Sequence, residues 1–417
     1  MDLIKRNSAA AAATLLTLTA ISFTASAAPN PIAYEAEVIS SPYIDGDIRI
    51  VGQAVAVNNS GRIAGTARAF GPDRRIDFAD AFNWKKNSDI EVFASPDLGD
   101  PTLVNLFNAT DQNENGAIVG SRMIRQPSSQ TGRLLAIRGE LITKSGEYII
   151  LPEPSPYAPI GDRYRTQANA INSIGQVVGT SSIAGEYGQS LGQYAILWNK
   201  DLQPILLSPL PNTLRPNDTA NAINSNGYIV GDARFQPIES DESTEATIWN
   251  PYHEISIIPS PYTSPEYNVS SSATGINNKN AVCANSSITP KGTRYSISTS
   301  FLWDEENGSQ ILGPVDLEIP EGSFPSTWTE DINEWGFIVG RSAISTPGPV
   351  IGTRISGERG TIWIDGIAID LNNLVVGFDG IIQNAVSIND RGQIAANALD
   401  SESQPVALLL TPKFGKN

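Results

Sequence analysis

The chain has very little of the chemistry on which most catalytic and metal sites depend. Its 417 residues include one cysteine, Cys283, and one histidine, His253. These numbers exclude an intramolecular disulfide framework, a multi-histidine zinc site and more than one histidine-based acid–base centre. We therefore assign no catalytic residue, no metal site and no cofactor, although a carboxylate pair of the glycosidase kind stays open.

Basic and charged residues are also scarce. The chain has 28 Lys and Arg against 44 Asp and Glu, a formal net charge of −16, and only 17% of its residues are charged. A field of this sign repels phosphate backbones, which excludes nucleic acid as a partner. The chain is instead rich in turn formers, with 35 Gly and 28 Pro, and these favour short strands over long helices.

The first 27 residues have the three regions of a secretory signal. Lys5 and Arg6 precede an apolar and small-residue run from 9 to 23, and Ala25-Ser26-Ala27 forms an A-x-A cleavage site. A membrane anchor is the competing interpretation, but the run is short and diluted by Thr and Ser. No second long apolar run follows. We expect a signal peptide at 1–27 and an exported monomer, extracellular or periplasmic, without a membrane span.

One pattern recurs along the rest of the chain. Around Gly175, residues 168–179 read A-N-A-I-N-S-I-G-Q-V-V-G, and the same frame returns six more times. The central residues of the copies are Gly61, Gly116, Gly175, Gly227, Asn280, Gly336 and Gly392. An Asn stands three positions earlier in every copy: Asn58, Asn113, Asn172, Asn224, Asn277, Asn333 and Asn389.

The frame has the chemistry of a β-hairpin. An apolar strand ends in a polar turn, Gly accepts the positive φ of that turn, and a β-branched strand departs. We expect each Asn amide to cap its own turn. Five copies have another Gly four positions after the central residue, as in Gly65 and Gly179, which predicts that something bulky passes close by.

A second signature marks a third strand in most copies. It ends in Trp84, Trp198, Trp249, Trp303 and Trp363. We place Arg138 in the corresponding position of the second copy, where its stem would lie over a locally exposed surface. A further short apolar strand follows, so each copy of about 55 residues predicts four strands, the length of a propeller blade.

These observations predict an all-β, seven-bladed β-propeller of four-stranded antiparallel blades, as a single domain at 28–417. The last copy supplies only three strands. We expect residues 34–39 to provide the fourth, so that an N-terminal strand closes the ring and removes the free edges.

The repeated frame and the third-strand Trp resemble the HAF-repeat extracellular proteins of bacteria. Two further segments carry the resemblance, 370–374 (D-L-N-N-L) and 387–394 (S-I-N-D-R-G-Q-I). The similarity spans essentially the whole chain after residue 27. It implies export and a propeller-like fold, and it brings neither an agreed activity nor catalytic residues.

Departures from the repeat are where a functional site is expected, because a residue needed in every copy builds the blade. Residues 111–116 read D-Q-N-E-N-G, like the start of a calcium loop, but Arg122 stands where the bidentate Glu belongs. We favour a hairpin turn there. The repeated Asn side chains could also form a polar ring that takes a sugar or ion, although turn capping explains them. His253 is expected in a connecting loop, and Cys283 as a small buried hydrophobe.

Three functions fit this sequence. The first is a binding or scaffold propeller whose variable segments at 184–193, 239–245 and 344–359 present loops to a glycan or another exported protein. The second is a polysaccharide hydrolase or lyase with its site at the channel mouth. The third is a structural component of an extracellular matrix.

Overall fold

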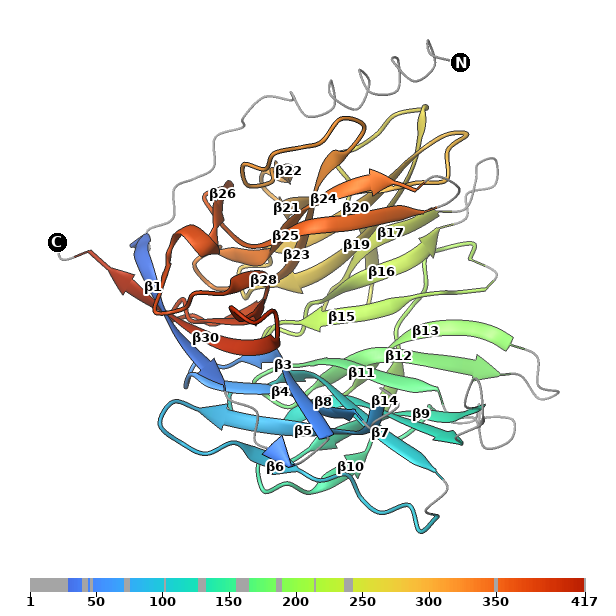
Figure 1. Ribbon diagram of the computed structural model, residues 1–417. Helices are drawn as coiled ribbons and strands as arrows, with labels where there is room; N and C mark the ends of the chain where they lie inside the picture. Colours follow the sequence, from blue (N-terminus) through green and yellow to red (C-terminus); the bar gives the residue numbers. More distant parts are fainter. Residues whose placement is uncertain are drawn as a thin grey trace.

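The computed structural model describes most of the chain as strands (Figure 1). The described residues are 29–39, 44–45, 48–70, 76–100, 103–126, 133–154, 165–184, 190–213, 215–235, 243–348 and 352–415. The predicted signal peptide lies outside them. Within these ranges no helix is long and apolar enough to cross a membrane.

Each repeat folds as an antiparallel sheet, and four of these sheets are separate and four-stranded. The first strands are β3 (Ile48–Val57), β7 (Val104–Gln112), β11 (Thr166–Ile171), β15 (Thr219–Ile223), β19 (Tyr267–Ile276), β23 (Phe324–Ile332) and β28 (Ile381–Ile388). The second strands are β4 (Arg62–Phe70), β8 (Ile118–Gln126), β12 (Val177–Ala184), β16 (Ile229–Phe235), β20 (Val282–Pro290), β24 (Ile338–Pro347) and β29 (Ile394–Leu399).

The third strands are β5 (Ile76–Lys85), β9 (Arg133–Ile142), β13 (Ser190–Trp198), β17 (Ser243–Trp249), β21 (Ile297–Asp304), β25 (Thr353–Ile364) and β30 (Pro405–Phe414). The outer strands are β6 (Glu91–Phe93), β10 (Tyr148–Ile150), β14 (Pro204–Leu206), β18 (Ile255–Ile257), β22 (Gly308–Leu312), β26 (Ile367–Asp370) and β1 (Pro31–Ile39). Short additions are β2 (Ile44–Asp45), β27 (Val375–Val376) and the 3-10 helix η1 (Leu371–Asn373). The predicted all-β class with four-stranded antiparallel sheets is confirmed.

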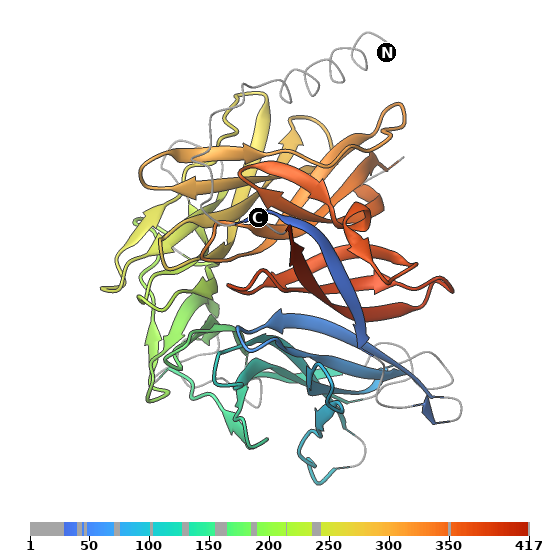
Figure 2. The same ribbon diagram turned by 90° about the vertical axis from the view of Figure 1, so that its left-hand side faces the viewer.

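The two ends of the chain meet in one sheet. β1 pairs antiparallel with β30, with Tyr34 opposite Pro412 and Ile39 opposite Ala407, as the sequence predicted. The blue β1 accordingly lies beside the red β30 in both views (Figures 1 and 2). The first strand of each copy contacts the first strand of the next, and β28 contacts β3. Each sheet therefore contacts the next one along the chain, and the last contacts the first.

The hydrophobic core is divided among the joints between consecutive copies. One buried cluster lies at each joint, so the described residues form seven such clusters rather than one central core. At the joint of the last copy with the first, Ala395 and Leu409 pack with Val57, Ile63 and Phe82. Burial of apolar area thus holds each sheet to its neighbour.

The third-strand tryptophans join copies as well. Trp198 is fully buried, and its indole N–H donates to the backbone oxygen of Pro152 in the preceding copy. Trp249 and Trp363 make the same kind of bond, to Ser208 and Gly313. A buried indole keeps a hydrogen-bond partner at each of these joints.

The repeated Gly after each turn admits a close neighbour, as predicted. Wherever this Gly occurs the neighbour is a backbone carbonyl, and at Gly65 and Gly120 it is also an aromatic ring, that of Phe82 and of Phe107. A Cβ on Gly179 would lie 1.8 Å from the carbonyl oxygen of Gln167, and one on Gly65 would lie 2.2 Å from that of Gln53. The first strand of each copy is shifted in register at this level, which brings its carbonyl toward the second strand.

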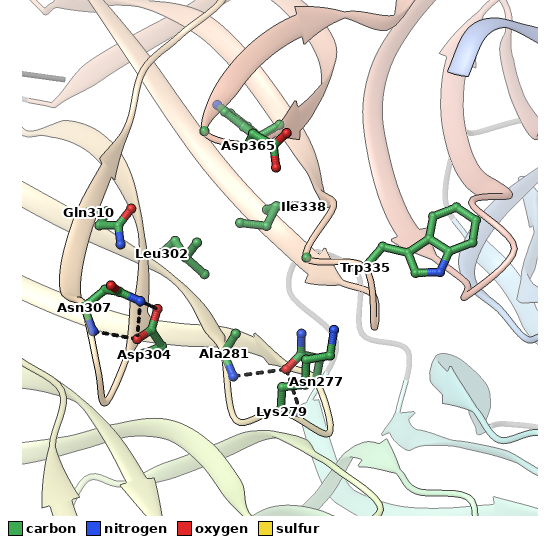
Figure 3. Close-up of a pocket in the computed structure, with 13 residues that line it drawn as sticks. Asn277, Lys279, Ala281, Leu302, Asp304, Asn307, Gln310, Trp335, Ile338 and Asp365 are labelled. Carbon is green, nitrogen blue, oxygen red and sulfur yellow. Dashed lines mark hydrogen bonds between the residues drawn. The ribbon is translucent and has the colours of Figure 1, made fainter. Parts of the chain in front are cut away.

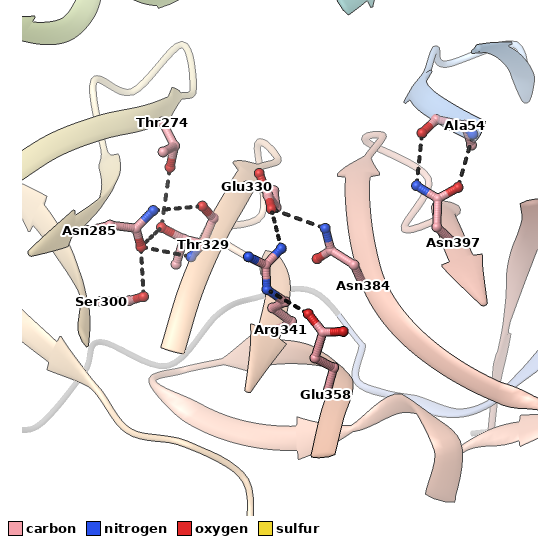
Figure 4. Close-up of polar contacts among 10 residues, drawn as sticks. All are labelled: Ala54, Thr274, Asn285, Ser300, Thr329, Glu330, Arg341, Glu358, Asn384 and Asn397. Atoms are coloured by element: carbon pink, nitrogen blue, oxygen red, sulfur yellow. Dashed lines mark hydrogen bonds and ion pairs between the residues drawn. The ribbon is translucent and has the colours of Figure 1, made fainter. Parts of the chain in front are cut away.

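Polar side chains on the second strands clamp the neighbouring copy (Figure 4). The Asn397 amide accepts from the backbone N–H of Ala54 at 3.0 Å and donates to its carbonyl at 3.1 Å, which ties the last copy to the first. Asn285 binds the backbone of Thr329 in the same two-sided way. In the sixth copy this position is Arg341, which lies 3.5 Å from both Glu330 and Glu358.

The variable segments are less loop-like than expected. β12 runs to Ala184 and β13 begins at Ser190, while β24 runs to Pro347 and β25 begins at Thr353. The prediction of loops over 184–193 and 344–359 is therefore wrong for their described parts, because the hairpin strands pair further outward. Segment 239–245 is described only from Ser243, where β17 begins.

Candidate functional site

The repeated Asn residues are buried, and they lie in the turns between the first and second strands of the copies. In each turn the Oδ1 atom accepts from the backbone N–H groups of the same turn, as it does for Trp335 and Phe337 at Asn333. The predicted turn capping is confirmed. The Nδ2 atom donates to the backbone oxygen of the next copy's Asn, a contact that the sequence did not predict. The chain of bonds runs 58→113→172→224→277→333→389→58.

These hydrogen bonds form a closed chain and engage the polar groups of the Asn side chains. Asn389 closes it by donating to the backbone oxygen of Asn58 at 2.8 Å, across 331 positions of sequence. The oxygen and the nitrogen of each amide are hydrogen-bonded within the protein. The seven Asn side chains therefore stabilise the fold and have few free groups with which to bind a ligand.

The calcium-like segment at 111–116 is a turn of the repeat, and its first residue, Asp111, binds backbone N–H groups. Asp111 is the last residue but one of β7, and its two carboxylate oxygens accept from the backbone N–H groups of Gln112 and of Ile171 in the next copy. Burial raises the pKa of Asp111 to about 7, although both hydrogen bonds act the other way. Asp331 plays the same part toward Ile388. In the described part of the chain, no three His, Cys, Asp or Glu residues are grouped as metal ligands.

Arg122, in the place of a calcium-binding Glu, is instead half of a buried ion pair. Its guanidinium binds both oxygens of Glu140, with Nε at 2.7 and 2.8 Å, and each residue is 2% exposed. Phe107 and Tyr148 lie against the guanidinium, 5.4 and 4.8 Å from its carbon. The pair lies within the sheet of the second copy, where Arg122 on β8 and Glu140 on β9 neutralise each other's charge.

The placement of Arg138 at the tryptophan position was wrong. The residue opposite Ile118 in β9 is Ile142, just as Trp84 lies opposite Ile63 in the first copy, and Ile142 is fully buried. The error came from counting along the chain, because the hairpin between the second and third strands differs in length from copy to copy. Arg138 lies opposite Arg122 within the sheet.

His253 and Cys283 lie where the sequence placed them. His253 is in the turn between β17 and β18, with a positive φ of 66°. Cys283 is fully buried at the joint of the fifth and sixth copies, and burial raises the pKa of its thiol to about 12. A thiol with so high a pKa stays protonated and is a poor nucleophile.

The candidate binding site lies between the fourth and fifth copies, at the end of the strands away from the Asn turns. It is a groove of about 400 Å³ lined by the end of β16, by β17, by β18 and by the connection from β18 into β19. Its aromatic and apolar lining residues are Phe235, Ile257, Pro259, Tyr262, Tyr267 and Val269, and its polar ones are Glu245, Ser260, Thr263 and Ser264.

Partly buried hydrogen bonds fix the wall of this groove. Tyr262 is 7% exposed, and Ser260 accepts from the Tyr262 backbone N–H at 3.2 Å while bonding the Ser286 hydroxyl at 2.9 Å. Burial raises the pKa of Glu245, and the hydroxyl of Ser243, 2.7 Å from its carboxylate, opposes that rise. The groove is therefore preformed rather than assembled by a ligand.

Aromatic side chains continue from the groove toward the sixth copy. The rings of Tyr295 and Phe324 are stacked, with centroids 5.9 Å apart and planes inclined by 11°. Burial raises the pKa of Tyr295, and the nearby phenol of Tyr267 adds to that rise. Sequence reasoning missed this set, because its members come from strands and connections of three copies and share no motif.

Comparisons with known proteins identify no relative by sequence. No family model and no curated protein matches the chain. Among solved structures, puromycin hydrolase is similar with a TM-score of 0.49 at 10% identity, over 93% of this chain and 55% of that one. This chain thus spans about half the length of that hydrolase.

Two other solved structures are similar over nearly their whole length. The Dos1 propeller has a TM-score of 0.40 at 10% identity, covering 93% of this chain and 96% of its own. An ulvan lyase of polysaccharide lyase family PL25, bound to -[GlcA(1-4)Rha3S]-, has a TM-score of 0.40 at 9% identity, over 95% and 96%. At these values the function has to be argued from this chain's own residues.

Proposed function

We propose that this chain is a seven-bladed β-propeller, exported by its N-terminal segment, that binds a glycan in the groove between the fourth and fifth copies. The architecture is supported by the seven clusters at the joints, by the closed circuit of Asn hydrogen bonds and by the pairing of β1 with β30. A ring of this kind removes every free sheet edge and holds its loops rigidly.

The aromatic lining of the groove carries the functional part of the proposal. Sugar rings have apolar C–H faces and polar rims, so they suit a site where Phe235 and Tyr267 offer aromatic surface next to Ser and Thr hydroxyls. Glu245 adds a carboxylate that can accept from sugar hydroxyls. An open groove of this lining fits part of a long chain better than an enclosed small molecule.

Binding is favoured over hydrolysis by the carboxylates of the groove. Glycosidases need two, about 5 to 9.5 Å apart, one on each side of the bond that breaks. Among the described residues that line the groove, Glu245 is the one carboxylate. A hydrolase or lyase, or a matrix component without a discrete ligand, therefore ranks second.

Glycan arrays followed by calorimetry with the best polysaccharide would test the binding. We expect Phe235→Ala and Tyr267→Ala each to weaken binding about tenfold, since a lost aromatic contact is worth on the order of 1 kcal/mol or more. Tyr252→Ala is the matched control, because Tyr252 is 85% exposed in the β17–β18 turn and lines no part of the groove.

Three outcomes would contradict the proposal. Equal loss in all three variants would remove the groove from the explanation. Release of new reducing ends from the bound polysaccharide would favour the hydrolase or lyase. The absence of binding to any glycan would favour another exported protein or a matrix as the partner.

Export and membership of the HAF-repeat family belong to the same proposal. They rest on residues 1–27 and on the repeated frame of sequence. Expression in a bacterium with an intact secretion system, followed by N-terminal sequencing of the exported protein, should give Ala28 as the first residue. Retention of residues 1–27 on a membrane-bound product would indicate the anchor instead.

A further inference from the structure

A second groove lies at the joint of the first and second copies. It has a volume of about 290 Å³ and is lined by β5, by the connection from β6 into β7 and by β7 itself. Phe78, Leu98 and Leu103 supply its apolar surface. The groove between the fourth and fifth copies has the same place in its own pair of copies, because it too lies between a third strand and the connection into the next copy.

An acidic side chain holds the same position in both grooves. On the third strands, Asp80 lies opposite Ala67, and Glu245 lies opposite Ala233. Each of these Ala residues stands six positions after the central Gly of its copy. Both acids line their groove, so the repeat brings a carboxylate to the same place twice.

The strand and the connection that complete each groove also match. The matching residues are Leu103 with Tyr267 and Asn105 with Val269 at the first strand, and Ser95 with Ser260 in the connection. The first two pairs stand thirteen and eleven positions before the central residue of the following copy, and each of the serines precedes a proline. The two grooves are therefore built from the same parts of the repeat.

An acid at this position of the third strand occurs in the first and fourth copies alone, which are the copies that begin the two grooves. The other five copies have Arg138, Tyr194, Thr299, Arg359 and Val406 there. The sheet therefore does not need a carboxylate at this position. Because the acid occurs together with a groove of this construction, we connect it with what the groove binds.

The cavity between the fifth and sixth copies is built differently (Figure 3). It has a volume of about 160 Å³ and is lined by the turn at 277–281 and by the turn that holds Asp304 and Asn307, whose side chains are hydrogen-bonded to each other. Thr299, which holds the acid position of the fifth copy, does not line it. This cavity is therefore not a third groove of the same kind.

Hydrogen bonds preform the second groove, and its charged groups are acidic. The Asp80 carboxylate accepts from the backbone N–H of Ser95 at 2.9 Å, and the Asn105 amide donates to the backbone oxygen of Pro96 at 2.8 Å. Asp97 is exposed. Among the described residues that line either groove there is no Lys, Arg or His. Carboxylates accept from sugar hydroxyls and repel anionic sugars, so both grooves favour an uncharged glycan.

We propose that the groove between the first and second copies is a second site for an uncharged glycan, so that one chain binds two segments of it. The inference rests on the proposed function, because the class of ligand is carried over from the groove between the fourth and fifth copies. Phe78 offers the aromatic surface that Phe235 and Tyr267 offer there. Two sites on one chain bind a long polysaccharide more tightly than either site alone, or link two polysaccharide molecules.

Calorimetry counts the sites, with cellotetraose, laminaritetraose, mannotetraose and xylotetraose as uncharged probes and tetragalacturonate as the anionic one. We expect the wild-type chain to bind about two molecules of at least one uncharged probe. Phe78→Ala and Phe235→Ala should each weaken one site about tenfold and leave about one tight site. Ala94→Trp fills the second groove from an exposed position and replaces Phe78→Ala if that variant does not fold. Tyr252→Ala, outside both grooves, is the control.

The outcomes separate the two sites. One bound molecule per chain, unchanged in Phe78→Ala and Ala94→Trp, overturns the second site and leaves the first groove standing. Loss of binding in these two variants but not in Phe235→Ala supports the second site and counts against the first. Tighter binding of tetragalacturonate than of every uncharged probe overturns the class of ligand, and the absence of any binding overturns both sites.

Discussion

Replacing the repeated Asn of the last copy tests whether the ring is closed. Asn389→Ala removes two acceptor contacts within its turn, from the backbone N–H groups of Arg391 and Gln393, and the Nδ2 bond to the Asn58 carbonyl of the first copy. A further Nδ2 bond, to the Gln393 side chain, is only partly buried, and water can replace it. At about 1 kcal/mol for each buried bond, the free energy of unfolding falls by about 3 kcal/mol. With an unfolding entropy of about 2 cal/mol/K per residue, a domain of this size loses roughly 4 °C in melting temperature.

Calorimetric melting of three variants is the assay. Asn333→Ala loses the same kinds of bonds in mid-chain, so it should melt with Asn389→Ala. Asn250→Ala is the control, because Asn250 caps the β17–β18 turn with the same Oδ1 contacts and its Nδ2 atom donates to the exposed Glu254 of that turn rather than to another copy. We expect it to cost about 1 kcal/mol less. If Asn389→Ala behaved like Asn250→Ala while Asn333→Ala cost more, the last joint would be open and the reasoning refuted.

Three further predictions concern buried groups. The pKa of Asp111 rises from 3.8 to about 7 on folding, so the stability that its protonated form contributes is complete below about pH 4 and is lost as the pH rises through 7. The melting temperature of Asp111→Asn should therefore rise relative to that of the wild type between pH 5 and pH 8. A difference that stayed constant over this range would contradict the prediction. Cys283, buried with its pKa near 12, should resist iodoacetamide at pH 8 and react fully in urea, as read by mass spectrometry. Arg122→Ala should destabilise the chain by about 3–5 kcal/mol in denaturant unfolding by leaving Glu140 buried and unpaired, while Arg122→Met with Glu140→Leu should cost much less.

The parts of the fold that repeat could be predicted from the sequence. Asn172 and Gly175 predict a turn because their preferences act on the backbone within a few residues. The same pattern occurs in six other copies. The pairing of Tyr34–Ile39 with the last copy also followed, because a copy that lacks one strand leaves an edge for another segment to fill.

The features that the sequence did not predict, or predicted wrongly, depend on contacts between copies or on the length of a hairpin. The Nδ2 bond of Asn389 to the first copy is invisible in a local turn pattern. Arg138 was misplaced because register in a long hairpin is set by pairing rather than by counting. The groove brings Phe235 together with Tyr267 from the next copy, and neither residue stands out among the 31 Phe, Tyr and Trp of the chain.

The most direct measurement of ring closure is a disulfide across the two ends of the chain. Glu35 and Thr411 are direct partners in the β1–β30 ladder, so Glu35→Cys with Thr411→Cys should form one intramolecular bond on oxidation and raise the melting temperature. Glu35→Cys with Glu402→Cys is the mismatched control, since Glu402 lies nine residues before Thr411, in the β29–β30 turn. A folded protein that formed no intramolecular bond in the first pair, or formed it equally in the control, would contradict a ring sealed by its N-terminal strand.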